Sequence, residues 1–458
     1  MNLAPVLDGR SSDLGDGAPA LDIAVIGSGI SGLSAAWLLA RRHRVTLFEA
    51  DSRPGGHSNT LQVPCADEGT IAVDTGFIVY NEATYPNLTA LFAYLGVPTK
   101  ASEMSFAVSL DEGALEYSGS GLGGLFAQRT NLLRPRFWAM LRELARFYRE
   151  APADARRFDL VPLDAYLDAR GYGRAFREDH LYPMAAAIWS TPAARIGSYP
   201  TGAFVRFCEN HQLLSLGERA AWRTVQGGSV RYVERLTQAL GEGVKLESAV
   251  VQVRREADCV WLRTEGAADA RRFDHVVIGT HADQALRMLR DASSDERRVL
   301  GAFGYSRNRA VLHRDASLMP RRRAVWSSWN YAAARSSKGA PCITYWMNRL
   351  QGIDDATPLF VTLNPVREPR DETVIRSELY EHPIFNAPAI RAQAELWSLQ
   401  GQRRTWFCGA YFGSGFHEDG LQSGLAVAEA LGGVQRPWTV ANPSGRIRFP
   451  VAATAEIA

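Results

Sequence analysis

Residues 23–49 read IAVIGSGISGLSAAWLLARRHRVTLFE, and the order of apolar runs and turns in this stretch decides the fold. Gly27 permits a tight exit from a buried strand, Gly29 lets the backbone approach a pyrophosphate, and Gly32 lets the next helix pack closely on the sheet. The second apolar run ends on Glu49, which can accept hydrogen bonds from an adenosine ribose. The stretch therefore predicts a strand–helix–strand unit that binds a dinucleotide at its helix N-terminus. The expected contacts are Gly27, Gly29, Ile30, Ser31, Gly32 and Glu49.

A second Gly-x-Gly-x-x-Gly pattern occurs at Gly119, Gly121 and Gly124, but it lacks this context. The strand before it would be short, Pro135 interrupts the segment after it, and no second strand ends on an acid at the right distance. We interpret this copy as a flexible loop.

The composition fits an enzyme with more than one hydrophobic core. Of the 458 residues, 46% are hydrophobic and 22% are charged, and the net charge is +2. Without a basic excess to neutralise phosphates, we expect no nucleic-acid partner. The five cysteines lack the spacing of a metal site, so we expect no metal and reduced thiols in the cytoplasm.

The first twenty residues are polar and glycine-rich and lack the features of a secretory signal, which predicts a disordered leader at 1–20. Outside the strand–helix unit, no stretch is long and apolar enough to cross a bilayer. Any membrane contact would therefore be peripheral, at the inner face of the membrane.

The residues after Glu49 point to one dinucleotide. RPGGHSNT at 53–60 and VDTGF at 73–77 resemble the FAD-binding pattern of the flavin amine oxidase and phytoene desaturase superfamily, although His57 stands where amine oxidases usually have arginine. The resemblance implies non-covalent FAD in a Rossmann-like α/β domain of the glutathione-reductase type 2 family. The implied contacts are Ala50, Gly55, Gly56, His57, Thr60, Gly76 and Phe77.

In that superfamily the FAD site closes near the C-terminus, and TWFCGA at 405–410 followed by GSGFHEDGLQSGLAVAEAL is similar to the closing element. A helix beginning near Asp419 to Gln422 would point its positive dipole end at the charge that collects on a reduced flavin. Ala410 departs from the pattern, since many relatives have an acid there. The further contacts implied here and in two middle segments are Val250, Thr280, Gly409, Asp419, Gly420 and Leu421.

These segments predict an α/β fold in which a discontinuous FAD-binding domain carries an inserted α+β substrate domain. The FAD-binding domain is expected to comprise 21–100, 222–286 and 398–434, and the substrate domain 101–221 and 287–397. Residues 435–458 are expected to form a C-terminal tail.

The middle of the chain narrows the resemblance. Phrases such as AAAIWSTP, SSWNY and ITYWMNRLQ are similar to a bacterial branch of predicted NAD/FAD-binding proteins that accompanies cyclopropane-fatty-acid-synthase-like methyltransferases. The nearest functional parallel is the fatty acyl desaturase of furan fatty acid biosynthesis, and a flavin-dependent fatty acid isomerase is more distant. The resemblance implies a lipid or fatty acyl substrate and a functional partnership with a lipid methyltransferase.

Two features are compatible with a lipid. Alternation along two strand-like runs could put the rings of Trp326, Trp329, Tyr345 and Trp346 on one wall of an acyl slot, although ordinary core packing is an equal alternative. The segment from Leu122 to Tyr148 mixes large apolar residues with arginines. That pattern suits an element that docks on anionic phospholipid, but a solvated amphipathic helix pair explains it slightly better.

Catalytic groups are hard to assign. Many amine oxidases place a lysine opposite the flavin, yet Lys100, Lys245 and Lys338 lie in no matching motif, which weakens an amine substrate. His211 and His417 are the candidate acid/base residues, because histidine titrates near neutral pH, although a structural role is more common for either. Three functions stay open: a lipid desaturase or isomerase, an amine or small-molecule oxidase, and a flavin-bearing partner of a methyltransferase.

Overall fold

The computed structural model describes residues 19–65, 69–211, 213–214, 221–335 and 341–450. Of the predicted leader at 1–20, only residues 19 and 20 fall inside these ranges. Lys338 also lies outside them.

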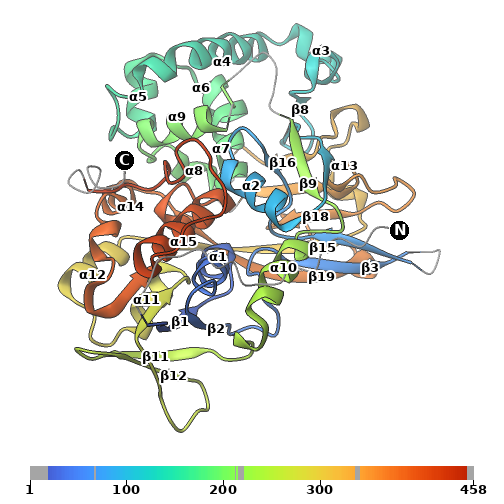
Figure 1. Ribbon diagram of the computed structural model, residues 1–458. Helices are drawn as coiled ribbons and strands as arrows, with labels where there is room; N and C mark the ends of the chain where they lie inside the picture. Colours follow the sequence, from blue (N-terminus) through green and yellow to red (C-terminus); the bar gives the residue numbers. More distant parts are fainter. Residues whose placement is uncertain (1–18, 66–68, 212, 215–220, 336–340, 451–458) are drawn as a thin grey trace.

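Separated stretches of chain meet in a five-stranded parallel sheet at the lower end of the molecule in Figure 1. In spatial order its strands are β10 (Val244–Lys245), β2 (Arg44–Phe48), β1 (Asp22–Ile26), β14 (His275–Ile278) and β20 (Thr405–Phe407). Neighbours in this sheet come from the beginning, middle and end of the chain, so the discontinuous Rossmann-like fold is confirmed.

Alternate residues of β1 face two different cores. Ile23 and Val25 pack under α1 (Ile30–Leu39) and α15 (His417–Gly432), together with α10 (Val230–Leu240) and α2 (Pro86–Leu95). Ala24 and Ile26 face the opposite side. That side is covered by β11 (Val250–Arg255), β12 (Val260–Thr264) and β13 (Arg271–Phe273), and by α11 (Ala282–Met288). The two-sided burial explains why these strands read as continuous apolar runs.

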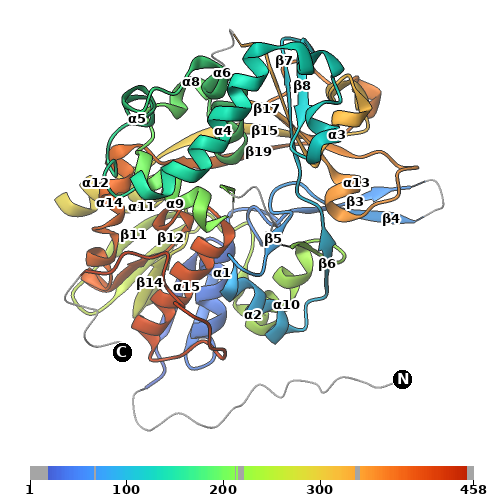
Figure 2. The ribbon, with the colours of Figure 1, turned by 90° about the horizontal axis from the view of Figure 1, so that it is seen from above.

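A seven-stranded mixed sheet forms the floor of the substrate domain. Its order is β19 (Val374–Ile384), β15 (Gly304–His313), β18 (Phe360–Leu363), β17 (Cys342–Trp346), β16 (Trp329–Ala333), β7 (Phe106–Leu110) and β8 (Leu115–Ser118). Helices cover one side of this sheet, as the view from above shows (Figure 2). They are α3 (Gly121–Leu125), α4 (Pro135–Asp154), α5 (Leu163–Ala169), α6 (Arg174–Phe176), α7 (Tyr182–Trp189), α8 (Ala193–Ile196) and α9 (Thr201–Asn210).

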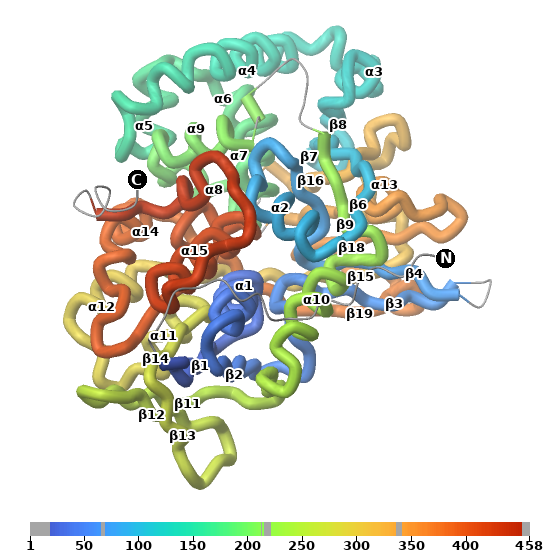
Figure 3. Tube along the Cα trace, viewed as in Figure 1, coloured from blue at the N-terminus to red at the C-terminus, as the bar shows by residue number. Residues whose placement is uncertain are grey.

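Smaller elements join the two parts. β3 (Thr60–Pro64) pairs with β4 (Thr70–Asp74), and β9 (Trp222–Val225) lies between β5 (Tyr80–Asn81) and β6 (Thr99–Ser102). The remaining helices are α12 (Ser294–Leu300), α13 (Met347–Gln351) and α14 (Ala387–Gln393). The colours along the chain show how often it passes between the two parts (Figure 3).

At three places, residues pack on a different part of the protein from the one that the predicted domain boundaries assign to them. Val299 of α12 and Ala389 of α14 pack on the nucleotide-binding side, although both helices lie in the predicted substrate domain. Conversely, Val63 and Val73 pack on the mixed sheet. The C-terminal segment to residue 450 lies against the body, where Trp438 stacks on Trp37 with ring centroids 6.0 Å apart. The division into domains remains an interpretation.

The second glycine pattern joins a strand to a short helix and is not, as was expected, a loop throughout. β8 leads through Gly119 into the short helix α3, and a Cβ on Gly124 would lie 2.2 Å from the Ser118 Oγ, so this glycine permits close packing. Within the described ranges, no helix is long and apolar enough to span a membrane.

Candidate functional site

A cavity of about 1500 Å³ runs from the carboxyl end of β1 into the substrate domain. It exceeds the roughly 300–1,000 Å³ common for single-ligand pockets, so it has room for a cofactor and a substrate. Thirteen of the nineteen predicted cofactor residues border it. They are Gly27, Gly29, Ile30, Ser31, Glu49, Ala50, Gly56, His57, Gly76, Phe77, Val250, Thr280 and Gly409.

The turn after β1 presents unpaired N–H groups to this cavity. Gly27 has φ of +93°, and Gly29 is the N-cap of α1 without a side-chain cap. The first intrahelical bond runs from the Leu33 N–H to the Gly29 carbonyl, which leaves the N–H groups of Ile30, Ser31 and Gly32 without an intrahelical acceptor and available to a ligand. The Glu49 carboxylate accepts from the Ser28 N–H at 2.8 Å, so its position beside the turn is fixed.

The other six predicted contacts support the site without bordering the cavity. A Cβ on Gly32 would lie 2.0 Å from the Gly27 carbonyl oxygen, and the Gly55 N–H donates to the Ser28 carbonyl at 3.1 Å. Thr60 donates to Asp74 at 2.6 Å. The last three lie in α15, which begins at His417 rather than near 419–422: Asp419, Gly420 and Leu421.

The buried carboxylate of Asp74 forms hydrogen bonds with three segments that are far apart in the sequence. It accepts from Thr60, from the backbone N–H and hydroxyl of Ser229, and from the Gln351 amide. Burial outweighs these bonds and raises the pKa of Asp74 to about 6.

His57 packs against two other rings on the cavity wall, at a tilt to each. Its ring centroid lies 5.0 Å from that of Tyr380 and 5.4 Å from that of His382. Burial, followed by the nearby histidines, holds the pKa of His57 well below its usual range. Its buried Nε2 has no protein partner within the described chain. A neutral imidazole therefore offers this nitrogen to a bound polar group.

His417 is committed to protein contacts. Its ring stacks on Phe77 with centroids 3.7 Å apart, and its Nε2 lies 3.0 Å from the Ser58 hydroxyl and 2.9 Å from the Tyr232 hydroxyl. Burial lowers the pKa of His417 to about 3. The first turn of α15 is occupied by Asp419, which accepts from the Phe416 N–H at 2.8 Å. We therefore regard His417 as a residue that orients the site.

His211 keeps one nitrogen available. Its Nδ1 lies 3.0 Å from the Phe207 carbonyl oxygen, so Nδ1 carries the proton and Nε2 carries the lone pair. The Nε2 atom is buried and has no partner in the described part of the chain. Burial lowers the pKa of His211 to about 4, so the ring is neutral. His211 borders the cavity as a hydrogen-bond acceptor.

His180, like His211, has a paired Nδ1 and a buried Nε2 without a partner, and no signal in the sequence identified it. The Tyr117 hydroxyl donates to the Asp179 carbonyl at 2.7 Å and therefore accepts from His180 Nδ1 at 3.0 Å. The buried His180 Nε2 is left without a partner among the residues described, and burial lowers the pKa of the ring to about 4. His180 lies in a π-helical turn, Arg177–Leu181, a conformation frequent at functional sites.

Only two of the four predicted aromatic wall residues border the cavity. Trp329 and Tyr345 face each other across β16 and β17 with ring centroids 5.4 Å apart, and both line it. Trp326 and Trp346 pack instead with Phe360 in a separate cluster. Trp346 follows Tyr345 in β17 and therefore points to the opposite face of the sheet. Trp326 lies before β16 begins at Trp329, so neither residue lines the cavity as expected.

The far wall of the cavity is apolar. Leu125 of α3, Leu141 and Leu144 of α4, and Met184 and Ile188 of α7 line it. No lysine of the described chain borders the cavity, and its carboxylates belong to the nucleotide-binding loops and β19: Glu49, Asp51, Glu378 and Glu381.

The residues present fit FAD. The glycine turn offers N–H groups to a diphosphate, Glu49 can accept from a ribose, and the rings and unpaired nitrogen of His57 border the space beyond. Burial raises the pKa of the Cys408 thiol to about 12, so this cysteine stays protonated beside the site.

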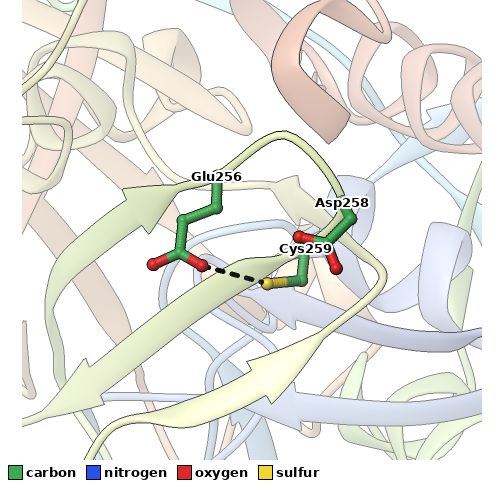
Figure 4. Close-up of side chains that lie close together, drawn as sticks. All are labelled: Glu256, Asp258 and Cys259. Carbon is green, nitrogen blue, oxygen red and sulfur yellow. Dashed lines mark hydrogen bonds between the residues drawn. The ribbon is translucent and has the colours of Figure 1, made fainter.

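One group of potential metal ligands occurs in the part of the chain that the structure describes. Glu256, Asp258 and Cys259 lie together at the turn between β11 and β12 (Figure 4), with the Cys259 thiol 3.6 Å from Glu256. Both carboxylates are exposed and are paired, Glu256 with Arg254 and Asp258 with Arg272. We assign no function to this group.

Comparisons with known proteins place the chain among flavin-containing oxidoreductases. A family profile described as "Flavin containing amine oxidoreductase" matches residues 30–306. Amine oxidase [flavin-containing] A of Equus caballus is 27% identical over 256 residues, which cover 53% of this chain and 46% of that protein. The chain thus spans about half the length of this relative.

Solved structures share the fold. Wild-type putrescine oxidase bound to putrescine has a TM-score of 0.64 at 16% identity, covering 90% of this chain and 99% of the other. A CLA-producing fatty acid isomerase from P. acnes has a TM-score of 0.60 at 15% identity, covering 90% and 98%.

Proposed function

Because the chain belongs to the flavin-containing amine oxidoreductase family and has a flavin cofactor, we propose that it oxidises a branched, unsaturated fatty acyl chain of a phospholipid. The observation that carries this proposal is the apolar far wall of the cavity, contributed by α3, α4 and α7. An acyl chain gains free energy by leaving water for such a wall. A charged amine placed there would be buried without a carboxylate partner, which is costly.

The proposed reaction is a desaturation. The flavin supplies the two-electron oxidant. The acyl chain loses a hydride from a carbon next to its double bond, where the double bond and the methyl branch spread the developing positive charge. It then loses a proton, and a second double bond forms. Return of the hydride to another carbon would make the protein an isomerase with the same pocket.

The protein supplies a cavity with an apolar wall and a proton acceptor. His180 and His211 are the two candidates, because each presents a buried, unprotonated Nε2 in the cavity wall. Their low pKa values do not prevent this role, since a proton next to an allylic cation is strongly acidic. His417 is proposed to orient the flavin side of the cavity through Ser58 and Tyr232.

An amine substrate is the second candidate, because a curated amine oxidase A is similar to half of the chain. The shared fold does not decide between the two, since both putrescine oxidase and a fatty acid isomerase have it. A methyl-branched substrate would require a lipid methyltransferase to supply it.

Anaerobic bleaching of the flavin tests the proposal. The purified yellow protein is mixed in turn with methylated unsaturated phospholipid, free fatty acid and amines, and the visible absorbance is followed. Bleaching by the acyl substrates supports the proposal, and product analysis then separates a diene from a shifted double bond. Bleaching by amines alone refutes it, and bleaching by none favours a non-catalytic partner of a methyltransferase.

A further inference from the structure

We propose that one end of the substrate domain docks on a membrane containing anionic phospholipid. The docking surface, called the apolar tip, consists of the side chains of Leu122, Leu132, Leu133 and Trp138. They belong to α3, to the turn Arg129–Leu133 and to the first turn of α4. The inference deepens the proposed function and rests on it, because it names where a phospholipid substrate would reach the protein.

The apolar tip is unusually exposed. Leu122 is 75% and Leu133 is 85% accessible, and Leu132 and Trp138 are each 48% accessible. Single exposed apolar residues are ordinary, but four large ones within residues 122–138 form a patch of the kind that marks an interaction site.

Local contacts join the segments that carry three of these side chains. The Trp138 indole N–H donates to the Leu132 carbonyl at 2.9 Å, and its ring lies 5.5 Å from that of Phe126. The Phe126 N–H in turn donates to the Leu122 carbonyl at 3.0 Å. α3 and α4 lie at the end of the molecule opposite β1 and β2 (Figure 1), so the nucleotide-binding sheet does not obstruct this face.

The charge around the apolar tip suits an anionic bilayer. The sequence from 118 to 142 holds four arginines and no acidic residue. Arg136 pairs with Glu178 and Asp179, whereas Arg129 and Arg142 are exposed and form no ion pair with any described residue. Exposed leucine and tryptophan flanked by free arginines match the interfacial region, where apolar groups enter and guanidinium groups meet phosphates.

The same helices connect the apolar tip to the cavity. Leu125 of α3 and Leu141 and Leu144 of α4 line the cavity, while Leu122 and Trp138 of these two helices face outward. Docking at the apolar tip therefore brings the bilayer next to the apolar wall, so that an acyl chain need not cross water.

Vesicle flotation of the full-length holoprotein tests the proposal. The wild type is expected to float with phosphatidylcholine vesicles that contain phosphatidylglycerol and not with phosphatidylcholine alone. A Leu122→Asp/Leu133→Asp variant should bind about tenfold or more weakly, since two exposed apolar anchors are lost. An Arg129→Gln/Arg142→Gln variant should bind roughly thirtyfold more weakly, from about 1 kcal/mol per arginine near the surface. The matched control is Val366→Asp, at a residue 69% accessible elsewhere on the surface, which should bind like the wild type.

Three results would overturn the docking surface: no flotation of the wild type, flotation of Leu122→Asp/Leu133→Asp equal to the wild type, or equal loss in Val366→Asp. A wild-type dimer that Leu122→Asp/Leu133→Asp dissociates, with no flotation, would make the patch an interface between copies and also overturn it. Flavin bleaching by detergent-dispersed fatty acid, measured on the same variants, is independent of docking. Bleaching without flotation refutes only the docking surface, whereas flotation without bleaching refutes only the proposed substrate.

Discussion

Substituting Gly29 by alanine is expected to weaken FAD binding while leaving the stability of the apoprotein nearly unchanged. Gly29 has φ of −61° and ψ of 171°, which alanine adopts without strain, and a Cβ built there would meet no protein atom within 4 Å. The lower chain entropy of alanine favours the folded state by about 0.4–1 kcal/mol. Its poorer quality as an N-cap costs a similar amount, so the net change should be within about 0.5 kcal/mol.

The added methyl would instead occupy cavity space needed by the diphosphate. Loss of one hydrogen bond from a backbone N–H to a charged phosphate costs about 1.5–3 kcal/mol, which is roughly a 10- to 150-fold increase in the Kd for FAD. Gly32→Ala is the matched contrast. Its Cβ would lie 2.0 Å from the Gly27 carbonyl oxygen, so α1 must shift, and the apoprotein should lose about 3 kcal/mol.

The assay needs apoprotein from which the flavin has been removed. Urea unfolding followed by circular dichroism gives the free energy of unfolding, and quenching of FAD fluorescence gives the Kd. If Gly29→Ala binds FAD as tightly as the wild type, the diphosphate does not lie against this glycine. If Gly29→Ala destabilises the apoprotein as much as Gly32→Ala, the space above Gly29 is not open. Either result refutes the reasoning.

Three further predictions concern pH, catalysis and stability. The pKa of Asp74 is raised from 3.8 to about 6 in the fold. Between about pH 4 and 6 the folded protein therefore keeps a proton on this carboxyl group that the unfolded chain has released. The free energy of unfolding falls by on the order of 3 kcal/mol as the pH rises through this window. Urea titrations across that window should show a flatter dependence for Asp74→Asn, and an unchanged slope would contradict the shift. If His180 or His211 accepts the proton, its glutamine variant should slow anaerobic bleaching by the acyl substrate about 100-fold or more at unchanged flavin content; full rates in both variants would remove both residues from the mechanism. Glu296→Gln removes one of the two carboxylate partners of Arg255, whose side chain is fully buried and which keeps Asp291 as the other, and should cost about 1.5–3 kcal/mol in thermal or urea unfolding. Glu395→Gln, in an exposed pair with Arg298, should cost less than about 1 kcal/mol, and equal losses would refute the argument.

Local spacing was enough to predict the nucleotide-binding unit. Strand, turn and helix between Asp22 and Leu39 follow from contacts within a few residues, and the apolar runs of β1 and β14 mark strands buried on both faces. The start of α15 was placed too late. Asp419 caps the helix from inside its first turn, so the acid marks a position after the start.

The residues that line the substrate part of the cavity depend on which face of each strand or helix packs against another element. Alternation predicts that Tyr345 and Trp346 point in opposite directions, but only the packed sheet shows that Tyr345 faces the cavity and Trp346 faces Phe360. His180 gave no sequence signal, because its role depends on Tyr117, a residue 63 positions away.

The amino-acid sequence alone determined the FAD-binding fold, because a glycine turn followed by a helix and an acid-ended strand satisfies its backbone and its ligand through near neighbours. Only the tertiary structure decided which other segments complete the cavity and which side chains face it. The positions of His180, His211 and Asp74, the apolar wall and the exposed tip result from segments far apart in the chain. Their contacts are set by long-range packing, and burial then sets their charge states.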